Sequence, residues 1–298
     1  MRCESALIRL DELRTGELDT REVDAVREHL EHCEYCEGVY RRITGIATSA
    51  RSLLGECPTS CADSLERKLF DRVAPASAGG LDLWIAFSEQ GLNDLVVAAG
   101  RSFEDYVWSH FKRFGKELRR ADLPGTLEQQ VRDGVAGRGV EKPQVDLSAL
   151  PDFERRVLET LISIPNGELR SYGWVAREAG RPGAVRAVGN VCAHNPVPLV
   201  VPCHRVVPAA GGLGGYGLGP EMKRRLLERE GVDLERIERL ERVKAKYVKA
   251  GAKWYCFPTC RHVRGIAWSD LEPVRDEREA AELGLIPCDT CRPLVSAA

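Results

Sequence analysis

The chain has 298 residues, enough for two or three domains, since globular domains hold roughly 100 to 150 residues each. It contains no apolar run near the roughly 20 residues that span a bilayer, which excludes a membrane-spanning protein and indicates a cytoplasmic one. The formal net charge of −2 excludes a uniformly basic nucleic-acid binder, but residues 169–229 hold nine Lys and Arg against three Asp and Glu and predict a local basic face.

The N-terminal region has the spacing of a helical unit. Apolar stripes over 7–13 and 23–30 predict two helices within a unit at 1–45. The pattern then weakens, and a stretch rich in Pro, Ala, Ser and Gly predicts a linker over 46–79. Cys57 and Cys61 are expected to be linker thiols.

A mixed region follows the predicted linker. Residues 83–97 are rich in β-favouring side chains and contain Gly91, which predicts a hairpin. Apolar periodicity predicts helices over 103–120 and 153–163.

Two short helical patterns stand next in the chain. They cover 172–178 and 184–193 and are separated by a Gly-Arg-Pro-Gly turn, which predicts a helix-turn-helix. A charged helix is expected over 222–230, closed by Gly231, and a helical connector over 233–246.

The C-terminal segment 247–298 has few large apolar residues and needs a cross-link, such as a bound metal, to fold. Cysteines in a protein expected to be cytosolic are thiols or metal ligands rather than disulfides. Four of the eleven cysteines form one C-x3-C and one C-x2-C pair, which predicts a closed tetrahedral zinc site. These ligands are Cys256, Cys260, Cys288 and Cys291.

A second set of metal-ligand residues lies at the N-terminus. His29 and Cys33 are one helical turn apart, Cys36 follows, and Cys3 completes a predicted Cys3His zinc site. His32 is an alternative ligand to His29. The competing interpretation is an ordinary helical hairpin with incidental cysteines.

The most reactive-looking motif is Pro202-Cys203-His204-Arg205, which places a thiol beside an imidazole and a guanidinium. Cationic neighbours favour the thiolate, the form that attacks carbon. The alternative interpretation of Cys203 is an inert buried cysteine.

With its preceding Asn195-Pro196 turn, this motif resembles the O6-alkylguanine-DNA alkyltransferase family, and the likeness extends over about 81–231. The resemblance implies an α+β multidomain chain. A central α/β N-terminal subdomain at 80–148 would precede a winged-helix-like DNA-binding and catalytic domain at 149–232. Two small zinc-binding units would flank them.

The resemblance also assigns catalytic roles. Cys203 would accept the alkyl group, with His204 as its base through a bound water and Glu230 holding the imidazole tautomer. Asn195 would brace the turn, and Tyr172 would push on the target phosphate and protonate the guanine leaving group.

DNA would be bound in the minor groove, with the target nucleotide rotated out of the stack. The expected DNA contacts are Arg186, Tyr172, Ala187, Gly189, Arg205 and Tyr216. Arg186 would replace the extruded base, while the small residues would permit close approach. Gly217 departs from the family pattern, which places a side chain there that can contact the lesion, and this puts the range of alkyl groups in doubt.

The two ends carry resemblances of their own. The C-terminal cysteines resemble the Ada metal-binding domain, which would make Cys256 a second methyl acceptor for phosphotriesters; a purely structural zinc site is the alternative. The N-terminal segment resembles the zinc-binding anti-sigma factor fold, which implies a sigma factor as a partner.

The sequence therefore predicts a single-turnover repair protein for O6-alkylguanine in double-stranded DNA. It is expected to be a monomer without membrane association, to hold zinc at both ends and to need no cofactor for the Cys203 chemistry. The alternatives are a non-catalytic protein that flags alkylguanine and a sigma-linked regulator.

Overall fold

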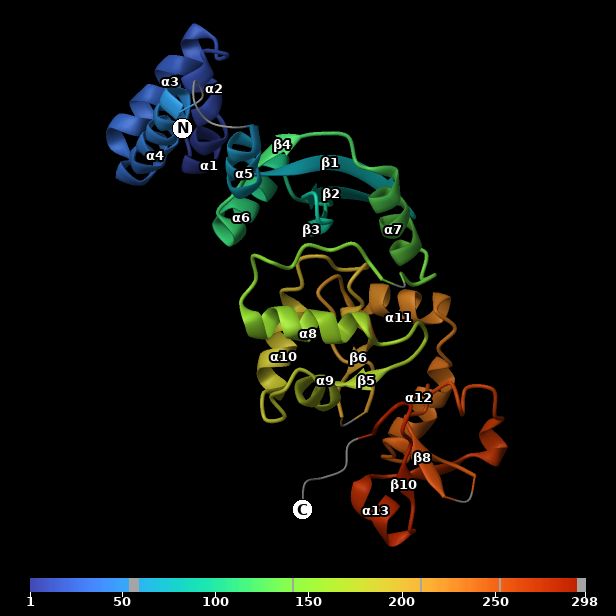
Figure 1. Cartoon of the computed structure of the whole chain (residues 1–298). Coiled ribbons are helices and arrows are strands. Elements are labelled where there is room, and N and C mark those ends of the chain that lie inside the picture. Colours follow the sequence, from blue (N-terminus) through green and yellow to red (C-terminus); the bar gives the residue numbers. More distant parts are fainter. Residues whose placement is uncertain (54–58, 141, 210, 252, 294–298) are drawn as a thin grey trace. The chain divides into compact units, whose positions relative to one another are not determined.

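The computed structural model describes residues 1–53, 59–140, 142–209, 211–251 and 253–293 (Figure 1). Two units divide the chain, Met1–Leu123 and Pro124–Ala298. Within the described residues, no helix is both long and apolar enough to cross a membrane. Cys57 lies outside these residues.

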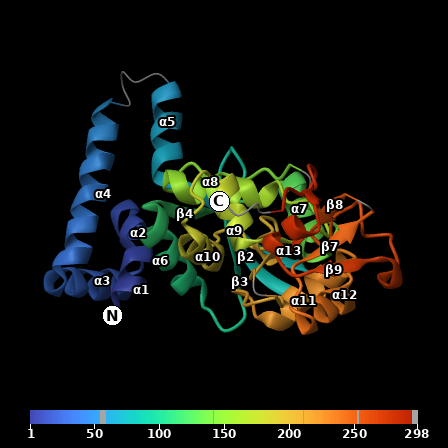
Figure 2. The same cartoon turned by 90° about the horizontal axis from the view of Figure 1, so that it is seen from below.

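Four helices, rather than the predicted two, form the N-terminus: α1 (Cys3–Ile8), α2 (Leu10–Thr15), α3 (Thr20–His32) and α4 (Glu34–Leu53). Gly16, in the left-handed region at φ 79°, ends α2, and Asp19 and Glu22 form a capping box that starts α3. Figure 2 shows α4 beside the short helices. Leu10, Val26 and Val39 are the buried core of this bundle.

A four-stranded sheet and two helices complete the first unit. The helices are α5 (Thr59–Leu69) and α6 (Phe103–Phe114), and the strands are β1 (Phe70–Ala78), β2 (Leu81–Phe87), β3 (Leu92–Val97) and β4 (Glu117–Arg120). The strand order is β3-β2-β1-β4, with β1 antiparallel to β2 and parallel to β4. The hairpin predicted over 83–97 is confirmed as β2 and β3.

Two predictions for this unit were wrong. The range 46–79 is not a linker: α4 continues into it, and it supplies α5 and β1, a strand paired on both sides. The helix predicted over 103–120 ends at Phe114, because Gly115 adopts φ 68°, and the chain then returns as β4.

A buried polar network connects α6 to the sheet. His110 is fully buried, with Nε2 3.1 Å from an Asp71 oxygen and Nδ1 3.2 Å from an Asp94 oxygen. Lys116 Nζ lies 2.9 Å from the other Asp71 oxygen. Burial alone would lower the pKa of His110, but the two carboxylates raise it. The hydrogen bonds of His110 to two buried carboxylates therefore connect α6 to the sheet.

The second unit begins with helices and two short strands. Its elements are α7 (Gly125–Val135), α8 (Asp152–Ile162), β5 (Arg170–Ser171), α9 (Tyr172–Glu178), α10 (Val185–Ala193), the 3-10 helix η1 (Cys203–Arg205), β6 (Val206–Val207), α11 (Pro220–Arg229) and α12 (Leu234–Arg242). The helices predicted over 172–178 and 184–193 are confirmed as α9 and α10. Helix α7 belongs to this unit, so the predicted subdomain end at residue 148 falls well inside it.

The C-terminal cysteine unit, residues 247–293, contains β7 (Tyr247–Ala250), β8 (Trp254–Cys256), η2 (Trp268–Asp270), β9 (Glu272–Val274), α13 (Glu277–Glu282) and β10 (Ile286–Pro287). The sheet order is β10-β8-β7-β9. The ring of Tyr247 lies 5.2 Å from that of Tyr255 and 5.5 Å from that of Phe257. This core is small, as the composition predicted.

Candidate functional site

Cys203 lies at the start of η1, directly after a buried apolar run, and is 5% exposed. The Asn195 amide Nδ2 donates to Cys203 Sγ at 3.1 Å and to the Val201 carbonyl at 2.9 Å. Asn195 Oδ1 accepts from the Val197 backbone N–H at 3.1 Å. One amide therefore both shapes the turn and hydrogen-bonds the sulfur. Cys203, Asn195, His204 and Glu230 are together called the Cys203 centre below.

Glu230, at the C-terminal end of α11, joins the two residues that follow the thiol. Its Oε1 lies 2.8 Å from His204 Nε2, and the Arg205 guanidinium donates to both Glu230 oxygens at 2.8 to 3.1 Å. Arg205 Nη1 also donates to the Ile164 carbonyl at 2.6 Å. Burial alone would raise the pKa of Glu230, but its bonds to His204 and Arg205 lower that pKa to about 2.

Arg205 is consequently a corrected prediction. It was expected to contact DNA, but it is 5% exposed and all of its bonds are internal. A buried guanidinium requires a carboxylate partner, and Glu230 is that partner.

Burial also affects the pKa of the thiol. It raises the pKa of Cys203, against the lowering effects of the Asn195 hydrogen bond and the Lys223 charge. Burial likewise lowers the pKa of His204, although Glu230 opposes this. Burial therefore opposes the thiolate that the cationic neighbours were expected to favour. His204 Nδ1 has no hydrogen-bond partner among the described residues.

Lys223 is a component that sequence reasoning missed. It is 1% exposed, and its Nζ donates to the Val206 carbonyl at 2.7 Å. Burial lowers the pKa of Lys223 to about 8, while the nearby Cys203 and Cys192 oppose the decrease. The available signal was position, because Lys223 lies on the same face of α11 as the buried Leu226 and Leu227.

Two tyrosines approach the same sulfur. Tyr172, the first residue of α9, is half-buried, and burial together with Cys192 and Cys203 raises its pKa. The ring of Tyr216 lies 6.1 Å from that of His204, and burial and Cys203 raise the pKa of Tyr216. Both hydroxyls therefore stay protonated near Cys203, and Tyr216, expected at DNA, has its hydroxyl buried in the centre.

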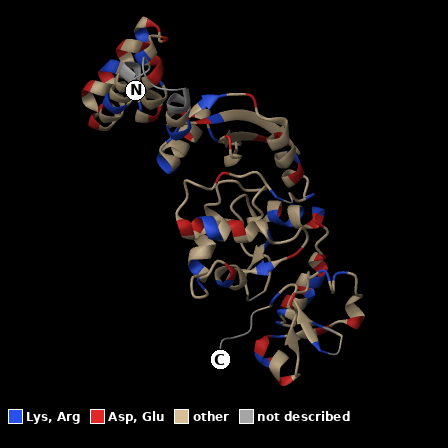
Figure 3. Ribbon diagram, viewed as in Figure 1, with Lys and Arg blue, Asp and Glu red and all other residues tan. Residues whose placement is uncertain are grey.

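The predicted basic face is smaller than its composition indicated. Arg170, Arg205 and Lys223 are buried, whereas Arg186 is exposed on α10. Acidic and basic residues alternate on α8 (Figure 3). Ala187 is half-buried, and a Cβ at Gly189 would meet nothing within 4 Å, so the α10 surface beside Arg186 is open.

Two clusters in the described chain have ligand atoms that all lie within 4.8 Å of one another and could hold a metal ion. The C-terminal cluster joins the four predicted cysteines, Cys256, Cys260, Cys288 and Cys291, all buried. The Phe257 backbone N–H donates to Cys291 Sγ at 3.4 Å. Four buried sulfurs suit zinc, which prefers tetrahedral thiolate sets.

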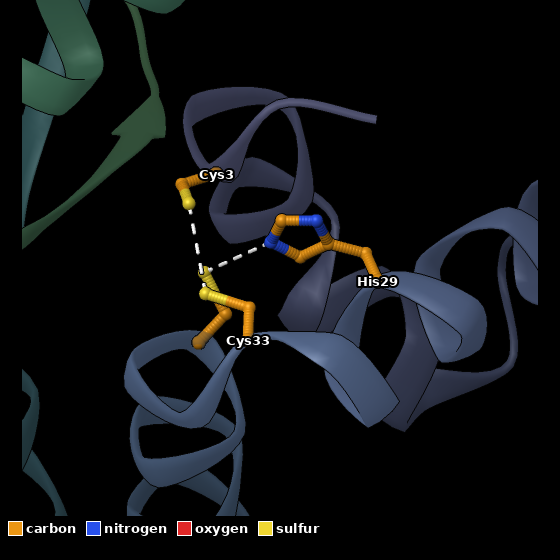
Figure 4. A group of neighbouring side chains, drawn as sticks. Cys3, His29 and Cys33 are labelled. Carbon is orange, nitrogen blue, oxygen red and sulfur yellow. Dashed lines mark hydrogen bonds between the residues drawn. The ribbon is translucent and has the colours of Figure 1, made fainter.

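The N-terminal cluster joins Cys3, His29, Cys33 and Cys36. Figure 4 shows the side chains of Cys3, His29 and Cys33 turned toward one another. His29 Nε2 lies 3.3 Å from Cys36 Sγ, and His29 Nδ1 lies 3.1 Å from the Met1 carbonyl. Such a carbonyl bond fixes the tautomer that offers Nε2 to a metal. His32, the predicted alternative, instead bonds the Glu28 carbonyl.

Sequence comparisons match the region that holds the Cys203 centre. Residues 152–232 match the family described as 6-O-methylguanine DNA methyltransferase, DNA binding domain. A protein of Salmonella typhimurium named methylated-DNA–protein-cysteine methyltransferase is 40% identical over 171 residues, which cover 56% of this chain and 95% of that relative.

A Mycobacterium bovis protein of the same name is 56% identical over 79 residues, 26% of this chain; the chain spans about half of that relative's length (48%). A Mycobacterium tuberculosis OGT solved in complex with DNA is 36% identical and covers 54% of this chain and 92% of its own, with a TM-score of 0.42. The identity and coverage of the Salmonella relative show that the chain belongs to the methylated-DNA–protein-cysteine methyltransferase family.

Proposed function

We propose that this protein repairs DNA by moving the alkyl group of O6-alkylguanine onto Cys203 Sγ. The observation that carries the proposal is the bonded geometry of the Cys203 centre, with Asn195 Nδ2 3.1 Å from the sulfur and His204 Nε2 2.8 Å from Glu230. The Salmonella and mycobacterial relatives are named methylated-DNA–protein-cysteine methyltransferases, which supports transfer to a cysteine.

The chemistry follows from the contacts of the Cys203 centre. As the sulfur–carbon bond forms and the carbon–O6 bond breaks, the thiol proton would pass through a bound water to His204, and Glu230 would stabilise the imidazolium. Tyr172, protonated beside the sulfur, supplies a proton so that guanine leaves as the neutral base. The thioether is stable, so each molecule acts once.

DNA binding would use α9 and α10. The family description that matches residues 152–232 is a DNA-binding domain, and Arg186, exposed on α10, would fill the space of an extruded nucleotide. The open surface at Gly189 permits a close approach of the groove. The sigma-factor partner stays a prediction of the N-terminal sequence pattern.

The buried ammonium of Lys223 should stabilise the sulfur as it becomes anionic. We expect Lys223→Met to slow alkyl transfer at neutral pH by about 10- to 100-fold and to shift the rate profile to higher pH, because a preorganised charge is lost. The measurement is the single-turnover rate against pH at saturating DNA. Arg224→Met, on the same helix but paired with Glu238, should behave as wild type. A profile that does not move contradicts this role.

A second acceptor is favoured by a pocket of about 400 Å³ beside the C-terminal cluster. Of the four cysteines, Cys256 and Cys288 line it, together with Trp254 and His262. We propose zinc at both clusters and methyl transfer from a DNA phosphotriester to Cys256. Bound zinc would keep the Cys256 sulfur as a thiolate.

Mass spectrometry after incubation with DNA containing O6-methylguanine tests the main proposal. A methyl increment is expected on the peptide with Cys203 and should disappear in Cys203→Ser. An increment on the Cys256 peptide after exposure to methyl phosphotriester DNA tests the second acceptor. Tight binding with unaltered DNA and free Cys203 would instead support the damage-flagging alternative.

A further inference from the structure

Residues next to the C-terminal cysteines contact the segment 167–171, which leads into the Cys203 centre. Thr259 directly precedes Cys260, is 5% exposed, and accepts a hydrogen bond from the Leu169 backbone N–H at 2.7 Å. Arg261 directly follows Cys260, and its backbone N–H donates to Glu168 at 3.3 Å. The residues on both sides of Cys260 therefore hydrogen-bond this segment.

Two further contacts are made by residues that directly follow a cysteine of the cluster. Phe257, directly after Cys256, presents its ring 5.4 Å from the buried Arg170 guanidinium. The backbone carbonyl of Arg292, directly after Cys291, accepts from the Arg177 guanidinium at 2.7 Å. Metal ligation sets the geometry of such cysteine turns, so it also sets where these flanking groups lie.

The opposite side of the segment is bonded to the Cys203 centre. The Gly167 backbone N–H donates to Glu230 Oε2 at 3.2 Å, and Arg170 and Ser171 pair with Val206 and Val207 directly after η1. A Cβ at Gly167 would stand 2.6 Å from the Glu230 carbonyl oxygen and 2.8 Å from an Arg264 nitrogen. The backbone at Gly167 thus passes between Glu230 and Arg264 with no space for a side chain.

The end of the segment sets the start of α9. The Ser171 hydroxyl accepts from the Trp174 backbone N–H at 3.1 Å and caps the helix, and Tyr172 is its first residue. Any displacement of 167–171 therefore moves both the Glu230 contact and Tyr172.

We infer that the C-terminal cysteine unit is a positioning part of the Cys203 centre, with Thr259 as the positioning residue that joins them. Metal binding at the C-terminal cluster, which is distant in sequence from Cys203, thereby governs the geometry of alkyl transfer. This inference rests on the proposed function of Cys203.

Thr259→Val tests the inference in the full-length, zinc-loaded protein, because valine keeps the shape and removes the hydroxyl. Amide exchange at Leu169 should rise about tenfold, as expected when a buried backbone donor loses its partner. The single-turnover rate at saturating O6-methylguanine DNA should fall about tenfold, while the affinity for DNA stays unchanged.

Two further variants control the experiment. Thr259→Ser restores the hydroxyl and should rescue both readouts. Thr290→Val is the matched control, since Thr290 precedes Cys291 as Thr259 precedes Cys260 but bonds His262 at 2.8 Å. It should leave exchange and rate as in wild type, with zinc retained in all variants.

The inference is overturned if Thr259→Val exchanges and reacts like wild type, or if Thr290→Val is equally slow. If Thr259→Val loses zinc, Arg264→Ala takes its place, because Arg264 bonds the Asn166 carbonyl at 3.0 Å and its loss should raise exchange at Gly167. If wild type transfers no methyl group, the proposed function fails, and amide exchange alone still decides whether the contact holds the segment.

Discussion

Glu230→Gln should destabilise the second unit by about 3–5 kcal/mol and slow alkyl transfer to Cys203 by at least about 100-fold. Glutamine keeps the shape but not the charge, so the buried Arg205 loses its anionic partner and His204 loses the negative charge that would stabilise its protonated form. Urea unfolding followed by circular dichroism measures the first effect, and rapid-quench single-turnover assays measure the second.

Glu228→Gln is the matched control. Glu228 is an exposed residue of the same helix, 3.9 Å from Arg224, and its loss should change stability by less than about 0.5 kcal/mol. If Glu230→Gln unfolds at the same urea concentration as wild type and reacts as fast, Glu230 has neither role.

The same carboxylate predicts an acid dependence. The folded-state pKa of Glu230 is about 2, below the ordinary 4.5, so its stabilisation is fully present above pH 4.5 and is lost as pH falls toward 2. The difference corresponds to about 3 kcal/mol. The stability gap between wild type and Glu230→Gln should therefore narrow over this range, and a constant gap would contradict the assignment.

Chelation should unfold the C-terminal cysteine unit and the N-terminal cluster while α8 to α11 stay folded. Zinc bound to such small sites contributes about 10–16 kcal/mol, which is folding energy for a segment with a small core. Hydrogen exchange with and without chelator is the measurement, and added zinc should restore protection.

Single substitutions separate the two metal sites. Cys260→Ser and Cys36→Ser should each lose one zinc equivalent and protection at one end only. Cys192→Ser, a thiol outside both clusters, should keep both. A wild-type protein that binds no zinc, or protection that chelation leaves intact, would remove both zinc assignments.

Local pattern was sufficient for much of this chain. Cys203 and His204 are adjacent, so their proximity needs no tertiary information, and the helices α9 and α10 follow from apolar spacing and a Gly-Arg-Pro-Gly turn. The cysteine spacings likewise predicted both clusters, because ligands one turn apart meet on one helix face or in one tight turn.

Local sequence pattern gave wrong predictions where contacts with distant segments determine the structure. Strand β1 contains Pro75 and is followed by Gly79 and Gly80, and these residues predict a loop unless the strands on either side are known. Arg205 and Lys223 are basic residues of the kind expected on a DNA-binding surface. Both are buried instead, because Arg205 bonds Glu230 and Lys223 bonds a backbone carbonyl.

The sequence by itself identified the adjacent Cys203 and His204, the helices α9 and α10 and the residues of both possible metal clusters. Only the tertiary structure showed that burial raises the pKa of Cys203 and that the buried Lys223 lies near it. It also decided that Thr259 contacts Leu169, ninety residues earlier in the chain. The reason is physical: dielectric environment and long-range pairing arise when distant segments pack, and no local spacing encodes them.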